Sequence, residues 1–461
     1  MSLFSKKKGN CRVRFAHLLR KARSYSSKAV ALASLLLLGV FLCGIAPSTF
    51  TLAEETQNIF EAEASQMGNE TETPETGQGT EVPQKTEETE TTGTAQKPEE
   101  TEAPQKMEET EKVRSGQETE VRAVWISFND YGALGLANKS KKAYRQRWDV
   151  ILKRCQEYGI NTVYFHVRAF DDASWMSRTF PASSYMIKSA SRNRTAAKTY
   201  SYDPLKIAIT ECHRFGLKIE AWINPYRISQ STYLDPASSV STARILRVVD
   251  ELKDYELDGF HFDDYFYSAG NYYFTPNEGT EYKLSVKGKA WKKSGAPKDD
   301  KKRQLVNAML KAVYQSIHFG GGRAKARFGI SPAGNVDYCQ SIGADVMTWL
   351  KEKGYLDYIV PQIYWTDVYY ENGRLTTMYS NRLNQWTDLN QNGSEMIIGL
   401  ASTYVGSSSS YDRGWSQRSD NLKRMVELLR KKGSRGYALF SASDLFRAAA
   451  QKELTELKGI L

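Results

Sequence analysis

The sequence predicts an α/β fold in which eight parallel strands close into a barrel surrounded by helices, the (β/α)8 or TIM barrel. From Val121 onward, short runs of β-branched and aromatic residues alternate with longer stretches whose apolar residues recur every three or four positions. Eight such strand–helix pairs follow one another within residues 121–461, as expected for a parallel barrel. An open doubly wound sheet is the alternative, but no glycine-rich phosphate loop follows the first strand.

Each expected strand is a short run that suits a buried, pleated surface. Several helices between them end in a glycine just before the next strand, because glycine readily adopts the left-handed conformation that stops a helix. The expected strands are Arg122–Phe128, Thr162–Arg168, Lys218–Tyr226, Gly259–Tyr265, Arg327–Ser331, Asp357–Tyr364, Met396–Ala401 and Gly436–Ser441. The expected helices lie near residues 141–158, 204–215, 241–254, 301–318, 344–353, 374–386, 416–432 and 443–458.

Active sites of such barrels lie at the carboxyl ends of the strands, on the loops that follow. Two of these loops are long, residues 169–203 after the second strand and 266–300 after the fourth. We expect their aromatic side chains to form the walls of a ligand cleft, with packing inside the loop as the alternative for any single ring. These side chains are Trp175, Phe180, Tyr185, Tyr272, Tyr273, Phe274 and Trp291.

Residues 1–53 read as a targeting segment. They carry nine Lys or Arg and no acid, and a cationic stretch precedes the apolar run Ala29–Ala46. Small residues follow, and this order of regions is typical of a secretory signal. We expect cleavage after Ala53. An uncleaved membrane anchor through residues 29–46 is the alternative, since eighteen apolar residues are near the lower limit for a bilayer span. The protein is therefore expected outside the cytoplasm, secreted or tethered at the cell envelope.

Residues 54–120 are expected to form a disordered acidic linker. They hold nineteen Glu against five Lys or Arg, and no apolar period. Such a segment cannot bury enough surface to offset the entropy of ordering it. An imperfect repeat of residues 80–90 at 101–111 fits an extended spacer.

The barrel region, residues 121–461, has a net charge of +15. This charge would suit nucleic acid, but a secreted destination favours anionic wall polymers or simple solubility, so we expect no nucleic-acid partner. No metal and no cofactor are expected, because the His pairs of zinc motifs and the fingerprints of nucleotide-binding loops are missing. A G-x-S-x-G nucleophile motif is also missing.

Alternation along the strands predicts which side chains face the barrel interior. Polar interior residues near the strand ends favour a ligand-binding mouth. His166 and His261 are either satisfied core histidines or ligand contacts, and Glu220 is expected foremost as a buried partner of Arg168. The polar interior set is Tyr164, His166, Arg168, Glu220, Trp222, Asn224, Tyr226, His261, Asp263, Tyr265, Ser331, Gln362 and Tyr364.

Asp263 is the best candidate for a catalytic group, because it is a carboxylate at the outer end of a strand beside aromatic rings. Glycoside hydrolysis needs two carboxyl groups near the bond that breaks. Alternation points the neighbouring Asp264 away from the interior unless the strand ends at Asp263 and the chain turns. The candidates for the second acid are Asp264, Asp367, Asp171, Asp172 and Glu220.

Six segments resemble the glycosyl-hydrolase-like 10 family, in the same order along the chain. They are Val121–Ser127, Gly159–Arg168, Ala221–Arg227, Asp258–Tyr267, Phe328–Pro332 and Pro361–Trp365. The resemblance implies a (β/α)8 barrel in an extracytoplasmic bacterial protein that hydrolyses cell-wall glycan. It implies Asp263 and Asp264 as the catalytic pair. It further implies substrate binding by Arg168, Asn224, Arg227, Tyr265, Gln362 and Tyr364, to which we add Trp365 of the same motif.

Two positions depart from the family pattern, Glu220 where His is common and Ala333 where a bulky apolar residue is common, so the pocket floor is expected to differ. Asp258–Tyr265 also resembles the fourth-strand signature of family-18 chitinases. That likeness puts Asp263 on the acid that orients the 2-acetamido group of the sugar, but Tyr265 replaces the catalytic Glu. Asp264 would then have to donate the proton.

We therefore expect a glycoside hydrolase that acts on bacterial cell-wall glycan of N-acetylated sugars. The alternative is a barrel that binds this glycan without cleaving it. The absence of a carboxylate from the seventh strand, where many barrel glycosidases place their nucleophile, keeps this alternative open.

Overall fold

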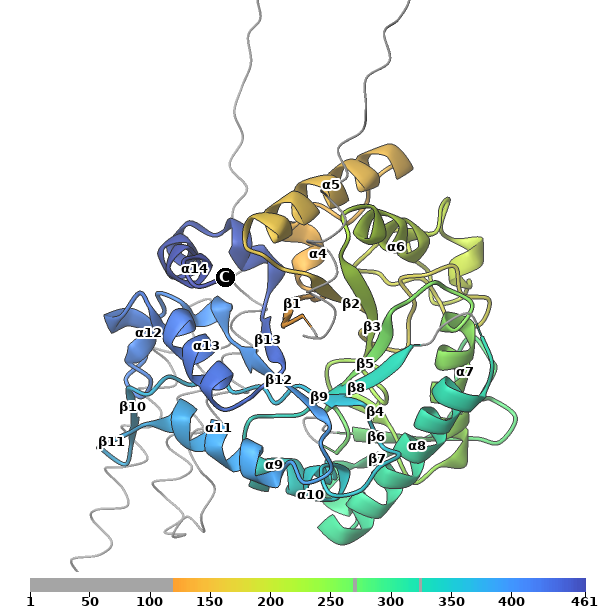
Figure 1. The fold of residues 1–461 in the computed structure, drawn as a ribbon. Coiled ribbons are helices and arrows are strands. Elements are labelled where there is room, and N and C mark those ends of the chain that lie inside the picture. Colours follow the sequence, from red (N-terminus) through yellow and green to blue (C-terminus); the bar gives the residue numbers. More distant parts are fainter. Residues whose placement is uncertain (1–118, 268–271, 323–325) are drawn as a thin grey trace, which may run out of the picture. The chain divides into compact units, whose positions relative to one another are not determined.

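A computed structural model describes residues 119–267, 272–322 and 326–461. The expected signal segment and nearly all of the expected linker lie outside these residues. The described part contains a closed barrel of eight strands with parallel neighbours (Figure 1), so the predicted fold is confirmed. In order around the barrel the strands are β1 (Val121–Ile126), β13 (Gly436–Leu439), β12 (Glu395–Leu400), β9 (Tyr358–Ile359), β8 (Arg327–Ser331), β5 (Gly259–Asp263), β3 (Lys218–Ile223) and β2 (Thr162–Arg168).

Helices surround the barrel (Figure 1). Their ends show ordinary capping: Ser140 accepts a hydrogen bond from the N–H of Ala143 at the start of α5, and Asp203 accepts one from Lys206 at the start of α6. The α-helices are α4 (Asp130–Ala133), α5 (Lys141–Glu157), α6 (Pro204–Arg214), α7 (Ser239–Leu252), α8 (Asp299–Phe319), α9 (Val336–Ser341), α10 (Val346–Trp349), α11 (Met378–Leu389), α12 (Gly414–Gln417), α13 (Asn421–Lys431) and α14 (Gln451–Lys458). The 3-10 turns are η1 (Ala196–Lys198), η2 (Lys293–Gly295), η3 (Ser402–Tyr404), η4 (Ala442–Phe446) and η5 (Ala448–Ala450).

Several expected elements are wrong in extent, including the helix expected at 344–353, of which only α10 forms, and the one expected at 416–432, which is divided into α12 and α13. The sixth strand is only β9, because Pro361 cannot donate a ladder hydrogen bond and isolated bridges from Gln362 alone continue the pairing. The helix expected at 374–386 begins only at Met378, since the preceding residues form the small hairpin of β10 (Tyr369–Glu371) and β11 (Arg374–Thr376). The helix expected near 443–458 is two 3-10 turns followed by α14.

The alternation predicted for the strands is confirmed at Tyr164 and Trp222. It is wrong for Arg168, which follows a shift of register in β2, and for Tyr226, which lies beyond β3 and packs in the larger core. Tyr164 and Trp222 belong to a buried cluster inside the barrel, whereas Phe165 and Phe262 pack in the larger core between strands and helices. The full interior cluster is Val121, Ala123, Trp125, Tyr164, Trp222, Tyr358, Val360, Ile397 and Ala438. Large rings therefore fill the lower barrel, as in other packed barrels of this kind.

A chain of hydrogen bonds crosses this filled region. Trp125 Nε1 donates to Nε2 of His261 over 3.0 Å, and Nδ1 of His261 lies 3.0 Å from the hydroxyl of Tyr358. Tyr358 in turn donates to the carboxylate of Glu220. Burial lowers the pKa of His261 well below its usual value, so the ring is neutral. His261 is thus a satisfied core histidine, one of its two expected alternatives.

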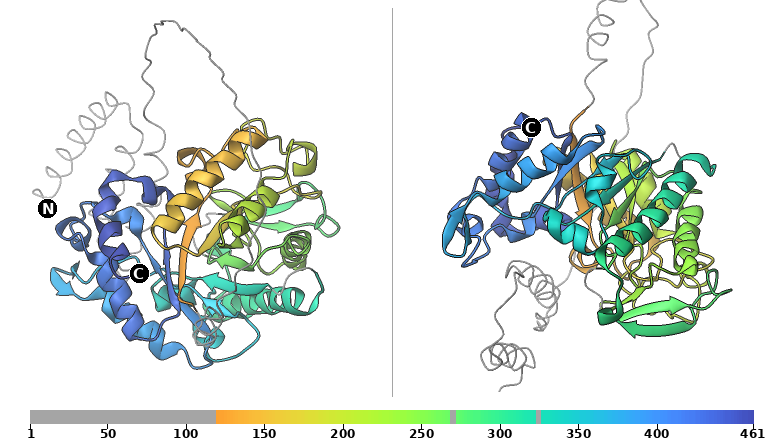
Figure 2. Two further views of the ribbon diagram at one scale, coloured as in Figure 1. Left: turned by 45° about the horizontal axis from the view of Figure 1, so that its top comes forward. Right: turned by 90° about the horizontal axis from the view of Figure 1, so that it is seen from below.

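The long segment after β5 contains strands that the sequence does not predict. β6 (Tyr272–Pro276) and β7 (Gly288–Lys292) form an antiparallel hairpin, and β4 (Thr232–Leu234) joins β6 as a third strand. The chain leaves β5 at its carboxyl end and returns to the start of α8, so this sheet belongs to the mouth side of the barrel. Figure 2 shows it standing off one end of the molecule.

The aromatic residues of the two long loops divide between packing and exposure. Trp175 and Phe180 are buried and belong to the core, whereas Tyr185 and Tyr272 are 36% and 44% exposed. The expectation of aromatic cleft walls is therefore wrong for Trp175, Phe180 and Tyr273, which are all buried in the core. Among the described residues no helix is both long and apolar enough to cross a membrane.

Candidate active site

Asp263 and Asp264 lie together where β5 ends. The strand stops at Asp263, and the turn that follows brings Asp264 beside it instead of sending it to the opposite face. The two side chains are hydrogen bonded to each other. Asp263 is 6% exposed and Asp264 is 9% exposed. The fourth strand of the barrel thus ends in a pair of adjacent, largely buried carboxyl groups.

Each aspartate is held by further hydrogen bonds. Oδ1 of Asp263 accepts from the side-chain amide of Gln362 at 3.1 Å and from the backbone N–H of Asp264 at 2.9 Å. Oδ2 of Asp264 accepts from the backbone N–H of Ala333 at 2.8 Å. Gln362 is itself fixed, because its amide also donates to the carbonyl of Ser331 at 3.1 Å.

The pKa of Asp263 is raised from its usual value of 3.8 to about 6, and burial is the main cause. The hydrogen bonds from the Asp264 backbone and Gln362, and the positive charge of Arg227, act in the opposite direction. A carboxyl group of this pKa can hold a proton at mildly acidic pH and release it during a reaction.

Several buried polar atoms near this pair make no hydrogen bond of ordinary geometry with a described residue. The His166 ring stacks on Trp222 with centroids 3.7 Å apart and an interplanar angle of 13°. Neither ring nitrogen of His166, nor Nε1 of Trp222, nor Oδ1 of Asn224 makes a hydrogen bond of ordinary geometry with a described residue, although all are buried. The strand register places Asn224 just beyond Ile223, which pairs with Phe262, and so at the level of Asp263.

Buried polar atoms of this kind are normally satisfied by water or a ligand. Burial lowers the pKa of His166 well below its usual value, so the ring is neutral and can offer one donor and one acceptor. The sequence predicted His166 and Trp222 as interior residues, and it left His166 open between a core histidine and a ligand contact. The clue available there was their alternation with apolar residues, and only the structure shows that their polar atoms are unmatched.

Arg227 and Tyr265 form one side of the mouth. The guanidinium of Arg227 lies 4.4 Å from the ring centre of Tyr265 and 5.0 Å from that of Phe170. Such cation–π contacts hold the arginine over aromatic faces while its charge acts on Asp263. Both residues are partly exposed.

Tyr364 and Trp365 lie on the segment after β9. The ring of Tyr364 is parallel to that of Phe440, with centroids 6.0 Å apart, and is 9% exposed. Trp365 is partly exposed and has the guanidinium of Arg382 at 5.9 Å from its ring centre. Gly334 fits against Trp365 and the Gln362 carbonyl, where a side chain would collide.

Arg168, expected as a substrate contact, is held in a buried network of ion pairs and hydrogen bonds. It has no exposed surface, it pairs with Asp171 at 2.9 Å, and it donates to the carbonyls of Asn224 and Pro225. Asp171 also accepts two hydrogen bonds from the buried Arg244. Arg168 therefore fixes the chain around Asn224.

The expected pairing of Glu220 with Arg168 is wrong. Glu220 is fully buried and pairs with Arg327 at 2.8 Å, near the amino end of the strands. The arginine comes from β8 and reaches Glu220 of β3 across Gly259 of the intervening strand β5. The other candidates for the second acid are also engaged: Asp171 as above, Asp172 by the N–H of Phe170, and Asp367 by Ser380. Asp264 remains as the partner of Asp263.

The described residues contain no group of three His, Cys, Asp or Glu side chains that could hold a metal ion.

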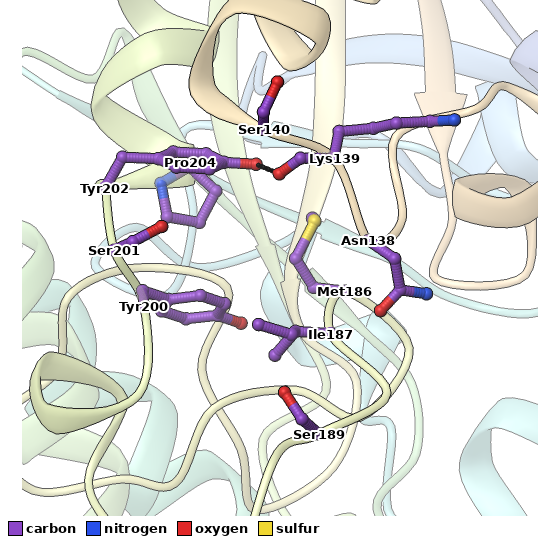
Figure 3. A pocket seen from close by; sticks show the side chains of 10 residues that line it. All are labelled: Asn138, Lys139, Ser140, Met186, Ile187, Ser189, Tyr200, Ser201, Tyr202 and Pro204. Atoms are coloured by element: carbon purple, nitrogen blue, oxygen red, sulfur yellow. Dashed lines mark hydrogen bonds between the residues drawn. The ribbon is translucent and has the colours of Figure 1, made fainter.

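A cavity of about 320 Å³ lies to one side of the mouth, between the loops that follow β1 and β2. Figure 3 shows Tyr202 bonded to the backbone of Lys139 across it, with the amine of Lys139 directed away. No carboxylate lines it, so it lacks the pair of carboxyl groups that glycoside hydrolysis needs. The lining residues are Asn138, Lys139, Ser140, Met186, Ile187, Ser189, Tyr200, Ser201, Tyr202 and Pro204.

A carboxyl pair at the carboxyl end of a (β/α)8 barrel, among polar and aromatic side chains, defines a barrel of the glycoside-hydrolase type. Residues 228–417 match the family model described as Glycosyl hydrolase-like 10. This segment carries Asp263, Asp264, Gln362 and Trp365, and the match confirms over these residues the resemblance seen in the sequence.

Named relatives agree with this family. The chain is 27% identical over 349 residues to "Glycosyl hydrolase DigH" of Escherichia coli strain K12, covering 64% of this chain and 76% of the relative. It is 28% identical over 375 residues to "Glycosyl hydrolase YngK" of Bacillus subtilis, covering 69% and 68%. The glycoside hydrolase domain of PgaB (BpsB) from Bordetella bronchiseptica shares 11% identity and a TM-score of 0.48, covering 74% of this chain and 99% of that one. This structural similarity adds nothing to the barrel assignment, which the strand pairing already establishes.

Proposed function

We propose that this protein hydrolyses a glycan of N-acetylated sugars in the bacterial cell wall, and that Asp263 and Asp264 carry out the reaction. The observation that carries the proposal is the hydrogen-bonded pair itself, in which burial raises the pKa of Asp263 to about 6. The family match supports the class of reaction. We place the protein at the cell wall because residues Met1–Ala53 resemble a secretory signal.

The contact between the two carboxyl groups favours one type of mechanism. Two acids that act from opposite faces of a sugar stand about 5–5.5 Å apart in retaining enzymes and about 6.5–9.5 Å apart in inverting ones. Side chains that hydrogen bond to each other are closer than either. The pair therefore suits a reaction in which the acetamido group of the substrate acts as the nucleophile. Both acids then lie on the same side of the sugar ring.

The hydrogen bonds suggest a role for each acid. Asp263, with its raised pKa, gives its proton to the glycosidic oxygen as the bond from that oxygen to C1 breaks. The acetamido carbonyl oxygen of the same sugar attacks C1, while Asp264, held by the N–H of Ala333, accepts the acetamido N–H. Water then adds to C1, and its proton returns to Asp263. This assignment reverses the one expected from the chitinase likeness.

The test is release of reducing ends from purified wall glycan. We expect Asp263→Asn and Asp264→Asn each to lower the rate by a factor on the order of 10² to 10⁴. Asp337→Asn, which changes an exposed aspartate on α9, is the matched control and should retain full activity. Glycan with its acetyl groups removed should not be cleaved. Cleavage of that glycan at the normal rate would rule out the acetamido mechanism.

Binding without cleavage is the second candidate function. It is favoured by β12, the seventh barrel strand, which ends at Leu400 and Ala401 without a carboxylate. A protein of this kind would sediment with wall glycan and release no reducing ends at any pH. Loss of sedimentation in a His166→Ala variant would then place the binding site in this same mouth.

A further inference from the structure

Tyr185 is the exposed end of a ring cluster formed by Phe128, Phe170 and Tyr185 at the barrel mouth. Its ring meets that of Phe128 edge-on, with centroids 4.6 Å apart, and lies nearly parallel to that of Phe170, with centroids 5.7 Å apart. Phe128 follows β1 and Phe170 follows β2, so both lie at the carboxyl ends of their strands. Tyr185 is 36% exposed, whereas the other two rings are 9% and 4% exposed. The cluster therefore reaches solvent chiefly through Tyr185.

Contacts on two sides join this ring cluster to the candidate active site. Phe128 meets the ring of His166, with centroids 5.4 Å apart, and His166 belongs to the polar interior of the mouth. The guanidinium of Arg227 lies 5.0 Å from the ring centre of Phe170, and its charge acts on Asp263. The exposed ring is thus continuous with the site and is not an isolated aromatic residue on the surface.

The turn that carries Tyr185 is fixed to the loop after β1. The backbone N–H of Asn138 donates to the carbonyl of Met186 at 2.9 Å, and the side-chain oxygen of Asn138 accepts from the N–H of Lys188 at 2.6 Å. Asn138 has a φ of 55°, a left-handed conformation that asparagine adopts more readily than most residues. A ring held in place in this way can bind a ligand at a low cost in conformational entropy.

Tyr185 and Trp365 lie on opposite sides of the mouth. Tyr185 is on the loop after β2 and Trp365 on the segment after β9, and these strands are four places apart in the closed ring of eight (Figure 1). β5, which ends in Asp263, is two places from each of them. Trp365 is also partly exposed. A glycan that lies across the mouth from one ring to the other would therefore have the carboxyl pair about halfway along its path.

We propose that Tyr185 is a binding platform for a sugar distant from the bond that breaks, so that long glycans bind more tightly than short ones. This inference rests on the proposed function, because the ligand is the same N-acetylated glycan. A pyranose ring presents a face of C–H groups that packs against a flat aromatic ring, while its hydroxyl groups stay in water. The residues around Asp263 hold the sugar that reacts, and Tyr185 contacts one farther along the chain.

The test measures binding by the full chain carrying Asp263→Asn, which should not consume the glycan. Calorimetry gives its affinity for a disaccharide, a tetrasaccharide and a hexasaccharide of N-acetylated wall glycan. Adding Tyr185→Leu keeps an apolar side chain against Phe128 and Phe170 but removes the flat ring, whereas Tyr185→Trp keeps a flat ring. Phe319→Ala is the matched control, because it removes an exposed ring where α8 ends, ahead of the amino end of β8.

We expect the hexasaccharide to bind about tenfold more tightly than the disaccharide. Tyr185→Leu should remove most of this gain, lowering the affinity for the hexasaccharide about tenfold and leaving that for the disaccharide unchanged. Tyr185→Trp and Phe319→Ala should bind the hexasaccharide as tightly as the Asp263→Asn protein without a second change.

Three results would overturn the proposal. Equal loss of affinity for the disaccharide and the hexasaccharide in Tyr185→Leu would make Tyr185 a packing residue that supports the site. Unchanged affinity for the hexasaccharide in this variant would show that Tyr185 does not contact the glycan. No binding of any of the three oligosaccharides would remove the ligand itself. Release of reducing ends by the chain with Asp263 intact tests the proposed function separately, so length-dependent binding without release would contradict hydrolysis and leave the platform standing.

Discussion

The side-chain amide of Gln362 lies 3.1 Å from Oδ1 of Asp263, and it joins the end of β5 to the segment that follows β9. This hydrogen bond stabilises the charged form of the carboxyl group. Gln362 thus limits how far burial can raise the pKa of Asp263, and it fixes the orientation of the group that is to donate a proton.

The variant Gln362→Met removes the amide and keeps the size of the side chain. The pKa of Asp263 should rise above about 6, because a bond that favours the charged form is lost. The high-pH limb of kcat/KM should therefore move to higher pH, while the maximum falls about tenfold as the acid loses its orientation. A pH–rate profile measures both changes. Gln391→Met, at an exposed site, is the control. An unmoved limb would contradict the role of Gln362.

Asp263→Asn should lower activity strongly and yet stabilise the fold at high pH. The folded pKa of Asp263 is raised to about 6 from 3.8, so its contribution to stability is full below the unfolded value and is lost as pH rises through 6. Removing the ionisable group should raise the free energy of unfolding by up to about 3 kcal/mol at pH 8, and by little at pH 4. Urea unfolding at the two pH values is the measurement. A variant less stable than the parent at pH 8 would contradict the burial argument.

His166→Phe should separate binding from stability. Phenylalanine keeps the stacking on Trp222, and neither ring nitrogen makes an ordinary hydrogen bond with a described residue. The free energy of unfolding should therefore change by less than about 1 kcal/mol. If a sugar satisfies these nitrogens, affinity for glycan should fall about tenfold. Calorimetry with a wall oligosaccharide and thermal unfolding test the two parts. A large loss of stability with unchanged affinity would make His166 a purely structural residue.

The pair of Glu220 and Arg327 should matter for stability alone. Burial raises the pKa of Glu220, while Arg327 and the Tyr358 hydroxyl favour its charged form. Arg327→Met leaves a buried acid without its cation and should cost about 3–5 kcal/mol. The double variant Glu220→Gln/Arg327→Met should recover part of that loss. Denaturant titrations give the values, and the pH–rate profile should stay unchanged. A double variant less stable than the single one would contradict the pairing.

Much of the barrel could be predicted because the patterns that specify its strands lie within short stretches of sequence. β2 and β8 begin and end where the sequence predicts them, and interior positions such as Tyr164 and Trp222 follow from alternation alone. The proximity of Asp264 to Asp263 was less predictable. It depends on β5 ending one residue before Asp264, and a strand two residues longer would have separated the two side chains.

What could not be predicted depends on contacts between distant segments. Arg327 reaches Glu220 across 107 positions of sequence, and which cation faces a buried acid depends on strand register as well as on residue type. The sheet of β4, β6 and β7 was missed for the same reason. Its strands are only three to five residues long and are held by pairing and by the stacking of Trp291 on Tyr273.

The rings that fill the lower barrel have a consequence for how a polymer is handled. Trp125, Tyr164 and Tyr358 are almost fully buried there, so the barrel is a cup with a closed base and has no through passage. A long glycan cannot be threaded from one end to the other. It has to lie across the rim or dip a free end inside, and both cleaved pieces must leave by the opening through which the chain arrived.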